Sequence, residues 1–401
     1  MPRTYIDLFA GCGGLSLGLH NAGWEGLFAI EKSNDAFSSL RYNLIDNIKH
    51  FSWVDWLPCS PLDIDKVLLD YKDQIIELRG KVDMVVGGPP CQGFSLAGKR
   101  IEHDRRNLLI DSYVDFIRLI MPQIILFENV HGFTVSFISE GEKSKNYSEY
   151  VKCELEKLGY TISGRIIDMS NFGVPQKRKR YIMVGCLSLD PSSFFCMMEE
   201  QALLFLSKKG LVSPVNTKSA IDDLKKYCGM VPSPDAPQFK AGLYGEASSS
   251  YQQLMRKSDI AEGCAVDSHR FANHTLAIEL QNRAMLDHAP RGKRITPSDG
   301  IVTGLQKRGI TILDPNQPAP TVTSIPDDFV HYDEPRILTV RETARIQSFP
   351  DWFEFKGKYT TGGKRRKKET PRYTQVANAV PPLFAEQAGL VLKEMLDNAR
   401  E

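Results

Sequence analysis

Short apolar runs alternate with amphipathic stretches along the first half of the chain. The apolar runs at residues 82–86 and 124–127 have the length of buried strands, further strands are predicted at 4–9 and 26–30, and a strand pair is predicted at 160–168 and 180–185. Apolar residues recur at helical spacing between some of these runs, most clearly over residues 108–120, where Pro122 stops the pattern. Strands that alternate with helices are typical of an α/β fold with a largely parallel sheet, which the sequence predicts here.

The first predicted strand runs into a glycine-rich turn, Ala10-Gly11-Cys12-Gly13-Gly14, and then into a helix that begins near Leu15. A strand, a glycine turn and a helix begin many nucleotide-binding folds, although the spacing here is not GxGxxG. The second strand ends in Glu31, which lies about 20 residues after the turn, where such folds hydrogen-bond a ribose. Together the two features predict an adenosine-bearing ligand at the first two strand ends.

A stiff loop that carries a cysteine follows the third predicted strand, and it reads Gly87-Gly88-Pro89-Pro90-Cys91-Gln92-Gly93-Phe94-Ser95. The two glycines permit a sharp turn, and the two prolines fix φ for the residues that deliver the thiol. Open α/β sheets bind ligands outside the carboxyl ends of their strands, so a nucleophile belongs here. The alternative is a Gly-Pro turn whose cysteine is only a small buried side chain.

Two further polar clusters lie next to predicted strands. Glu128 comes directly after the strand at 124–127, at the same functional edge, with an exposed loop acid as the alternative. Gln176, Arg178 and Arg180 alternate shortly before the last strand, so in an extended segment they would project to one face. Phosphate or base contacts need such an arrangement, whereas a solvated turn is the ordinary interpretation of a polar run.

The character of the sequence changes near residue 187, where proline, serine, aspartate and glycine begin to cluster. We expect a catalytic domain at 1–186, an irregular second domain at 187–335, and a return to the catalytic domain at 336–401. The histidines of the middle region lack matching cysteine or carboxylate spacing, so no metal site is predicted. The basic run Lys364–Lys368 is either a solvated loop or a phosphate contact.

The composition narrows the class of protein. The 401 residues carry 50 basic and 49 acidic side chains, so any surface for nucleic acid must be local. The 8 cysteines include no CxxC pair, which indicates neither a zinc site nor a disulfide framework. No apolar run approaches the roughly 20 residues that cross a bilayer. We expect a soluble, cytoplasmic, monomeric protein.

The ordered motifs resemble those of the cytosine-5 DNA methyltransferase family. They cover the chain outside 187–335, the region that is the target recognition domain in that family. One departure is Ala377, where the family usually has glycine, and we expect only a small change in packing on the cofactor side. The matching segments are DLFAGCGG at Asp7–Gly14, Glu31, GPPCQGFS at Gly88–Ser95, RNLL at Arg106–Leu109, ENV at Glu128–Val130, QKRKR at Gln176–Arg180, RETARIQSFP at Arg341–Pro350 and QVANAVPP at Gln375–Pro382.

This resemblance implies a doubly wound, Rossmann-like, S-adenosylmethionine-dependent methyltransferase domain with a smaller, irregular target recognition domain. It implies methyl transfer from S-adenosyl-L-methionine, which becomes S-adenosyl-L-homocysteine, to carbon 5 of a cytosine flipped out of duplex DNA, without a metal. Cys91 would add to carbon 6, Glu128 would bind the N3 and amino edge, and Arg178 would hold the flipped base with Arg180 beside it. DNA contacts are implied for Gln92, Ser95, Gln176 and Arg178.

The implied cofactor pocket draws on residues from both ends of the chain. Asp55 is an alternative to Asp63 for the adenine edge, because the surrounding region is poorly patterned. The pocket residues by family position are Phe9, Ala10, Gly11, Cys12, Gly13, Gly14, Glu31, Lys32, Asp63, Ile64, Pro89, Leu108, Asn378 and Val380.

Other functions remain open at this point. The tRNA-methylating branch of the family usually has PFT where this chain has Gly93-Phe94-Ser95. An amino-methyltransferase would need no thiol, and a catalytically silent homologue would only bind DNA. A companion restriction endonuclease fits a chain of this kind, although an orphan methylase would look the same.

Overall fold

A computed structural model describes residues 2–90, 108–135, 138–139, 142–143, 146–256, 263–300, 309–362, 365 and 369–399. The chain forms two compact units. Unit 1 comprises Met1–Asp168, Lys179–Ala202 and Phe384–Glu401, and unit 2 comprises Met169–Arg178 and Leu203–Leu383. These units are defined by packing, whereas the domains expected at 1–186, 187–335 and 336–401 follow from motifs and remain a prediction about where each function lies.

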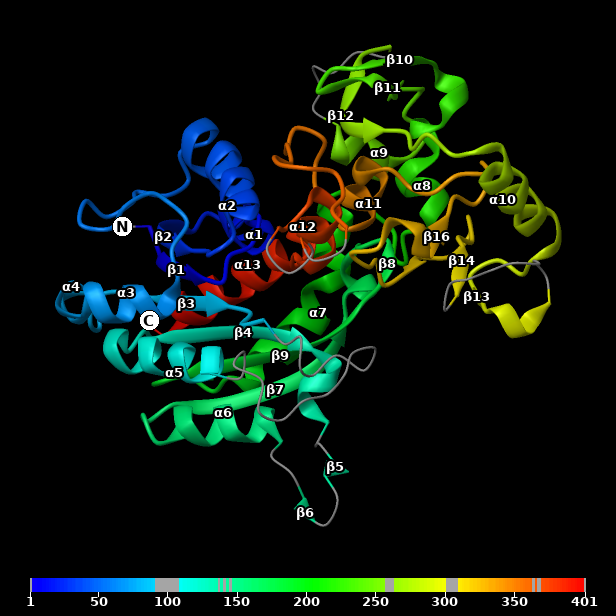
Figure 1. The fold of residues 1–401 in the computed structure, drawn as a ribbon. Helices are drawn as coiled ribbons and strands as arrows, with labels where there is room; N and C mark the ends of the chain where they lie inside the picture. Colours follow the sequence, from blue (N-terminus) through cyan, green and yellow to red (C-terminus); the bar gives the residue numbers. More distant parts are fainter. Residues whose placement is uncertain are drawn as a thin grey trace. The chain divides into compact units, whose positions relative to one another are not determined.

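Unit 1 is built on a mixed sheet with the strand order β2-β1-β3-β4-β9-β7 (Figure 1). The first four strands of this order run parallel, and β9 is antiparallel to both of its neighbours. The chain passes from β1 to β2 on one side and then to β3 on the other, which makes the β1–β3 edge a topological switch point. The strands are β1 Thr4–Leu8, β2 Glu25–Ile30, β3 Met84–Gly87, β4 Ile124–Val130, β7 Thr161–Asp168 and β9 Lys179–Cys186.

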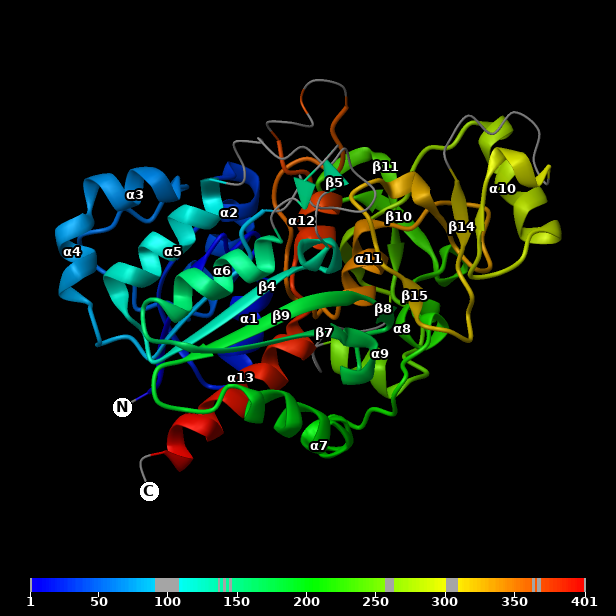
Figure 2. The ribbon, with the colours of Figure 1, turned by 90° about the horizontal axis from the view of Figure 1, so that it is seen from below.

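Helices cover both faces of this sheet, with α5 and α6 on one face and α13 and α7 on the other (Figure 2). The predicted α/β architecture, a Rossmann-like sheet between helices, is therefore confirmed. The helices that begin in unit 1, together with α13, are α1 Gly14–Asn21, α2 Asn34–Leu40, α3 Ile64–Asp70, α4 Lys72–Glu77, α5 Leu108–Ile120, α6 Tyr147–Glu156, α7 Ser192–Lys208 and α13 Pro382–Asn398, and a short separate pair is formed by β5 Ile138–Ser139 and β6 Glu142–Lys143.

The C-terminal helix α13 packs closely against the first helix and the turn that follows it. Trp24 donates a hydrogen bond from Nε1 to the carbonyl of Gly389 at 2.8 Å. A Cβ at Gly389 would lie 2.8 Å from the Cβ of Ala22, so only glycine lets the two segments approach this far. The C-terminal helix therefore belongs to the same unit as the N-terminal strands and helices.

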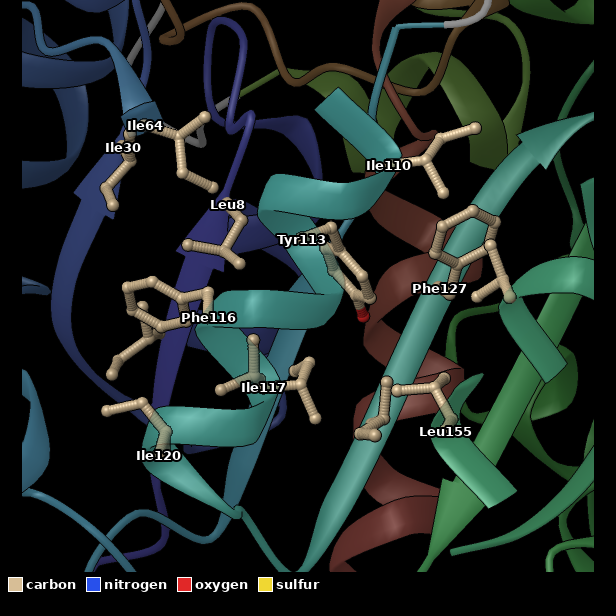
Figure 3. Packing of buried hydrophobic residues seen from close by; sticks show 14 of the residues in the cluster. Leu8, Ile30, Ile64, Ile110, Tyr113, Phe116, Ile117, Ile120, Phe127 and Leu155 are labelled. Carbon is tan, nitrogen blue, oxygen red and sulfur yellow. The ribbon is translucent and has the colours of Figure 1, made fainter. Parts of the chain in front are cut away.

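Helix α5 supplies much of the core on its face of the sheet (Figure 3). Tyr113, Phe116, Ile117 and Ile120 are each 0% exposed, and they pack in one cluster with side chains of the strands. The spacing that predicted this helix arises because these residues share its buried face. Each such side chain stabilises the fold by roughly 1.5–3 kcal/mol, which holds the sheet and its strand ends in place.

Unit 2 combines small sheets with short helices. Its sheets have the orders β10-β11-β12, β13-β14-β16 and β15-β8. Its elements are β8 Gln176–Lys177, α8 Thr217–Ile221, β10 Met230–Ser233, β11 Ala236–Leu243, α9 Ser250–Met255, β12 Ala265–Arg270, α10 Leu276–His288, β13 Arg294–Ile295, β14 Ile310–Ile312, β15 Ala319–Pro320, β16 Phe329–Val330, α11 Val340–Ile346 and α12 Arg372–Asn378.

Buried ion pairs hold helix α11 within unit 2. Arg345 pairs with Asp223 and with Asp351 at 2.6 Å each, and all three side chains are 0% exposed. Arg336 pairs with Glu342 at 2.6 Å in the same interior. Removing one partner of a buried pair leaves an uncompensated charge, so these arginines fix the fold of this unit.

The histidine His269 also has a structural place in unit 2. Its ring nitrogens lie 2.8 Å from the Thr339 hydroxyl and 2.8 Å from the Leu224 carbonyl. Burial lowers the pKa of His269 to about 4, so the ring is neutral at physiological pH. Within the described residues, no three histidine, cysteine, aspartate or glutamate side chains gather to hold a metal ion. No helix in the same residues is long and apolar enough to cross a bilayer.

Candidate active site

Strands β1, β2 and β3 end on one line across the sheet, and the neighbouring β4 crosses that line at Phe127 and continues to Val130. Leu8 on β1 pairs with Ile30 on β2 and with Gly87 on β3, and Gly87 pairs with Phe127 on β4. The residue that follows each of these positions therefore lies at the same edge. Those residues are Glu31, Phe9, Gly88 and Glu128. The register brings together the candidate residues that the sequence placed at separate strand ends.

The glycine turn after β1 is tied directly to Glu31. The backbone N–H of Gly11 donates to Glu31 Oε2 at 2.9 Å, and that of Ser33 donates to Oε1 at 2.6 Å. Burial raises the pKa of Glu31, partly offset by the backbone N–H groups that donate to it. Gly11 has φ +58°, and a Cβ built there would meet no described atom within 4 Å, so the turn borders open space.

The rest of the turn sets the start of helix α1. Phe9 leaves the strand with φ 59° and is half-buried. The N–H of Ala10 donates to the Ile30 carbonyl at 3.1 Å, and the N–H of Gly13 donates to the Ala10 carbonyl at 2.9 Å. Gly13 has φ +94° and precedes Gly14, the first residue of α1. Glycine adopts the left-handed backbone at residues 11 and 13 without the steric cost of a Cβ, which explains these two glycines in the sequence.

Cys12, within the same turn, is enclosed in the protein. Its side chain is 1% exposed, and burial raises the pKa of the Cys12 thiol to about 12. A thiol protonated at neutral pH is a poor nucleophile. The Cys12 thiol is therefore protonated at neutral pH, and the cofactor contact expected for this residue remains a prediction.

Lys32 and Asp63 extend the edge beyond Glu31. The N–H of Leu62 donates to the Glu31 carbonyl at 2.8 Å, which brings the start of α3 beside the end of β2. Asp63 caps α3 by accepting from the Asp65 N–H at 3.0 Å, and Lys32 Nζ forms an ion pair with its other oxygen. Burial opposes the ionised form, but these hydrogen bonds lower the pKa of Asp63 below its ordinary value.

Ile64 and Asp55 are the two other candidates in this region. Ile64, the first residue of α3, is 3% exposed and belongs to the hydrophobic core of the unit. Asp55, the alternative for the adenine edge, is exposed in a turn. Asp63 thus adjoins Glu31 through Leu62, and the choice between Asp63 and Asp55 for the adenine edge remains a prediction.

Glu128 forms the other end of the site. Its Oε1 lies 3.0 Å from Arg180 Nε, and both side chains are 13% exposed. Arg180 pairs with Val130 across the antiparallel β4–β9 ladder, so it lies diagonal to Glu128 on the same face. A Cβ at Gly88 would lie 3.0 Å from Glu128 Oε2 and 3.1 Å from the Glu128 carbonyl oxygen. Only glycine lets the cysteine loop start this close to the carboxylate.

The sequence interpretation missed a role for Asn129, the second residue of the ENV segment. Asn129 is 2% exposed; its Nδ2 donates to the Pro89 carbonyl at 3.2 Å, and its Oδ1 accepts from the Val130 N–H at 2.9 Å. The buried Pro89 lies two residues before Cys91. An amide side chain directly after the apolar run and its glutamate was the available signal, because buried amides need partners.

Gln176 and Arg178 belong to unit 2, and both are enclosed. Gln176 is 0% exposed; it accepts from the Val322 N–H at 2.9 Å and donates to Gln347. Arg178 is 1% exposed and donates from Nη2 to the carbonyls of Ala377 at 3.0 Å and Ala379 at 3.2 Å. In this conformation both side chains support the interior of unit 2, and their contact with DNA remains a prediction.

The segment that Arg178 supports contains two further pocket candidates. Asn378 ends α12 and is exposed, and Val380 two residues later is half-buried. Both belong to unit 2, whereas Glu31 belongs to unit 1. Their part in the cofactor pocket remains a prediction.

Some predicted site residues lie outside the described part of the chain. These are Cys91, Gln92 and Ser95, together with most of the basic run at 364–368. Leu108 begins helix α5. Pro90, the residue before Cys91, is described and exposed.

Comparison with known proteins identifies the family. Residues 3–394 match the model of the C-5 cytosine-specific DNA methylases. The chain is 33% identical over 403 residues to Type II methyltransferase M.DdeI of Desulfomicrobium norvegicum, covering 95% of this chain and 86% of that one. It is 31% identical over 405 residues to Type II methyltransferase M.PspPI of a Psychrobacter species, covering 99% and 81%.

Solved structures agree with this fold. A protein described as a DNA modification methyltransferase of an E. coli prophage superposes with a TM-score of 0.66 at 23% identity, covering 98% of this chain and 99% of that one. The Dnmt2 methyltransferase of S. pombe superposes with a TM-score of 0.55 at 14% identity over the whole of both chains. The match of the family model along the chain shows that it belongs to the C-5 cytosine-specific DNA methylases and is a DNA cytosine-5 methyltransferase.

Proposed function

We propose that the enzyme methylates carbon 5 of a flipped-out cytosine in a specific duplex DNA site, through a covalent adduct of Cys91 at carbon 6. The observation that carries this proposal is the common register of four neighbouring strands, which puts Phe9, Glu31 and Gly88, just past three strand ends, in line with Glu128 on β4. A cofactor at the first two ends and a base at the last two would meet over the β1–β3 switch point.

The residues at the β1–β2 end suit S-adenosyl-L-methionine, the methyl donor of this family. Glu31 accepts two backbone N–H groups, and a carboxylate has about four acceptor sites, so it retains capacity for ribose hydroxyls. The open space beside Gly11 gives room for the methionine portion. We assign Asp63 to the adenine edge. The preceding residue, Leu62, donates a backbone hydrogen bond to the Glu31 carbonyl, and Lys32 forms an ion pair with the Asp63 carboxylate. The bound cofactor supplies an electrophilic methyl group.

The chemistry falls to the cysteine loop. The Cys91 thiolate would form a bond to carbon 6 of the cytosine, which shifts an electron pair to carbon 5. Carbon 5 would then take the methyl group and leave S-adenosyl-L-homocysteine. Loss of the carbon 5 proton and elimination of the thiolate restore the aromatic ring and free Cys91.

Glu128 and Arg180 act on the opposite edge of the base in this proposal. Glu128 would hydrogen-bond N3 and the amino group, which makes the ring more electrophilic as the thiolate attacks. Arg180 would orient the Glu128 carboxylate through the 3.0 Å contact between Nε and Oε1. Arg178 would act indirectly, by holding the backbone on both sides of Asn378.

The choice of duplex DNA over tRNA is supported by the family match to DNA methylases and by relatives that are named Type II methyltransferases. A cytosine inside a duplex cannot reach the thiol, so the enzyme must flip it out of the stack. We further propose that methylation protects DNA from a companion restriction endonuclease.

One experiment tests the substrate. The purified enzyme is incubated with labelled S-adenosylmethionine and either duplex DNA or tRNA, and bisulfite sequencing of DNA from expressing cells then gives the methylated site. We expect label in duplex DNA and conversion-resistant cytosines at one recurring sequence. Label in tRNA alone would show that the tRNA alternative is correct. Full activity of Cys91→Ser would instead favour an amino-methyltransferase.

A further inference from the structure

Arg270, the last residue of β12, lies between two aromatic rings in unit 2. Its guanidinium carbon is 4.0 Å from the centre of the Phe239 ring and 3.7 Å from the centre of the Tyr359 ring. These distances are too short for a guanidinium that stands on edge to a ring. The two rings therefore stack on opposite faces of the guanidinium plane.

The local structure explains how the sandwich forms. Arg270 pairs with Ala241 across the antiparallel β11–β12 ladder, so Phe239 lies diagonal to it on the same face. Tyr359 is fixed from the other side, because its hydroxyl donates to Asp235 Oδ1 at 3.1 Å. The guanidinium is thus held in one orientation before any ligand arrives.

A second arginine in the same stack shows what is unusual about Arg270. Arg372 lies 4.3 Å from the Tyr359 ring centre, and its donors are occupied by Asp235 at 2.7 Å, Ser268 at 3.1 Å and the Gly357 carbonyl at 3.0 Å. Arg270 has neither a side-chain hydrogen bond nor an ion pair within the described part of the chain. Burial even lowers the pKa of the Arg270 guanidinium.

A half-buried cation without an ion-pair partner is costly for the fold, because no hydrogen-bonded carboxylate offsets the free energy of desolvation. The two rings block both faces of the guanidinium, so its N–H donors can only act in the plane, at the edge. A planar pair of acceptors is the ligand that this edge fits. In duplex DNA the O6 and N7 atoms of guanine present such a pair in the major groove.

We propose that Arg270 is a specificity-determining residue that binds the O6 and N7 edge of one guanine in the recognised DNA site. The inference rests on the proposed function, since it concerns the DNA that the enzyme methylates. A base contact fits better than a phosphate contact. The two rings hold the Arg270 side chain in one conformation, whereas side chains that contact the DNA phosphates are usually free to change conformation. Arg372, with all of these partners, is the structural member of the stack.

The test uses the full-length enzyme and the site found by bisulfite sequencing. Each guanine of that site is replaced in turn by 7-deazaguanine, which lacks the N7 acceptor, and kcat/KM is measured for the wild type and for Arg270→Met. Methionine keeps apolar packing between the rings but has no donors. We expect the wild type to lose about tenfold at one guanine and Arg270→Met to show no further loss there.

Matched variants separate base recognition from charge and from folding. Lys240→Met removes an exposed cation from the neighbouring strand β11, and it should retain the wild-type response to every 7-deazaguanine. Arg270→Lys keeps the charge without the planar fork, so its response should be smaller than that of the wild type. Melting curves show whether each variant is folded.

Two results would overturn the inference. One is a wild type that tolerates 7-deazaguanine at every guanine of its site. The other is an Arg270→Met enzyme that keeps the full wild-type response to 7-deazaguanine. Either result differs from a failure of the proposed function, in which the wild type would methylate no cytosine in DNA.

Discussion

Replacing Asn129 by alanine tests how the cysteine loop is held beside Glu128. The change removes the donor to the Pro89 carbonyl at 3.2 Å and the acceptor for the Val130 N–H at 2.9 Å. Each unsatisfied buried group costs about 1–3 kcal/mol, so the free energy of unfolding should fall by a few kcal/mol. The loop would also lose its anchor two residues before Cys91.

Asn129→Ala should also lower kcat, and it should do so without a matching change in cofactor binding. A displacement of the nucleophile by about 1 Å can lower the rate about 100-fold, so we expect kcat for Asn129→Ala to fall by about 10- to 100-fold. The KM for S-adenosylmethionine should change little, because Glu31 and the glycine turn are untouched. Single-turnover methyl transfer at saturating cofactor measures the first quantity, and cofactor titration measures the second.

Tyr160→Phe is a matched control for this variant. The Tyr160 hydroxyl donates to the Pro122 carbonyl at 2.7 Å, which is also a buried hydrogen bond to a proline, near the other end of strand β4. Its loss should lower stability and leave kcat unchanged. The reasoning fails if Asn129→Ala keeps the wild-type kcat, or if both variants lose kcat to the same extent.

Three further results are expected. Arg345→Ala should lower the free energy of unfolding by about 3–5 kcal/mol in urea titrations, because two buried carboxylates lose their 2.6 Å partner; a loss typical of a surface pair would contradict this. Burial raises the pKa of Asp7 in the folded protein to about 7, whereas its pKa in the unfolded chain is about 4. The contribution of Asp7 to the free energy of unfolding is therefore fully present below about pH 4 and is lost as the pH rises from about 4 to about 7. Asp7→Asn should therefore be more stable than the wild type above neutral pH and equal below about pH 4, and parallel pH profiles in urea titrations would disprove it. Arg180→Met should lower kcat by about 100-fold with little change in the KM for S-adenosylmethionine, because it releases Glu128 from the 3.0 Å contact; an unchanged kcat would remove Arg180 from the mechanism.

The sequence predicts the core of unit 1 well because its signals are local. The strand, glycine turn and helix at the start of the chain follow from apolar runs and from backbone angles that glycine adopts. The predicted strand ends differ from the observed ones where hydrogen bonds to a neighbouring strand decide how far a strand extends. Strand β4 continues through Glu128 to Val130, because the ladder with β9 extends to the Val130–Arg180 pair. A run of polar residues gives no sign of such pairing.

The N-cap of helix α6 is another feature that the local sequence does not determine. Asn146 and Ser148 both lie at the start of α6, and the helix begins at Tyr147 with Asn146 as its N-cap, which accepts from the Ser148 N–H. Both residue types cap helices well, so propensity alone does not choose between them.

Distant partners account for the remaining differences. The alternation of Gln176 and Arg178 indicates a shared face, and their partners Val322, Ala377 and Ala379 enclose that face. These partners lie more than 140 residues away along the chain. The sandwich around Arg270 likewise joins residues that no local pattern connects.

Covalent capture of the cysteine tests the central claim most directly. A duplex that carries 5-fluorocytosine at the methylated position cannot lose its carbon 5 substituent, so the adduct should persist when S-adenosylmethionine is present. We predict that digestion and mass spectrometry will find the modified nucleotide bound to Cys91, and that Cys91→Ser will form no adduct. An adduct on another residue, or methyl transfer by the wild type without any adduct, would contradict the account.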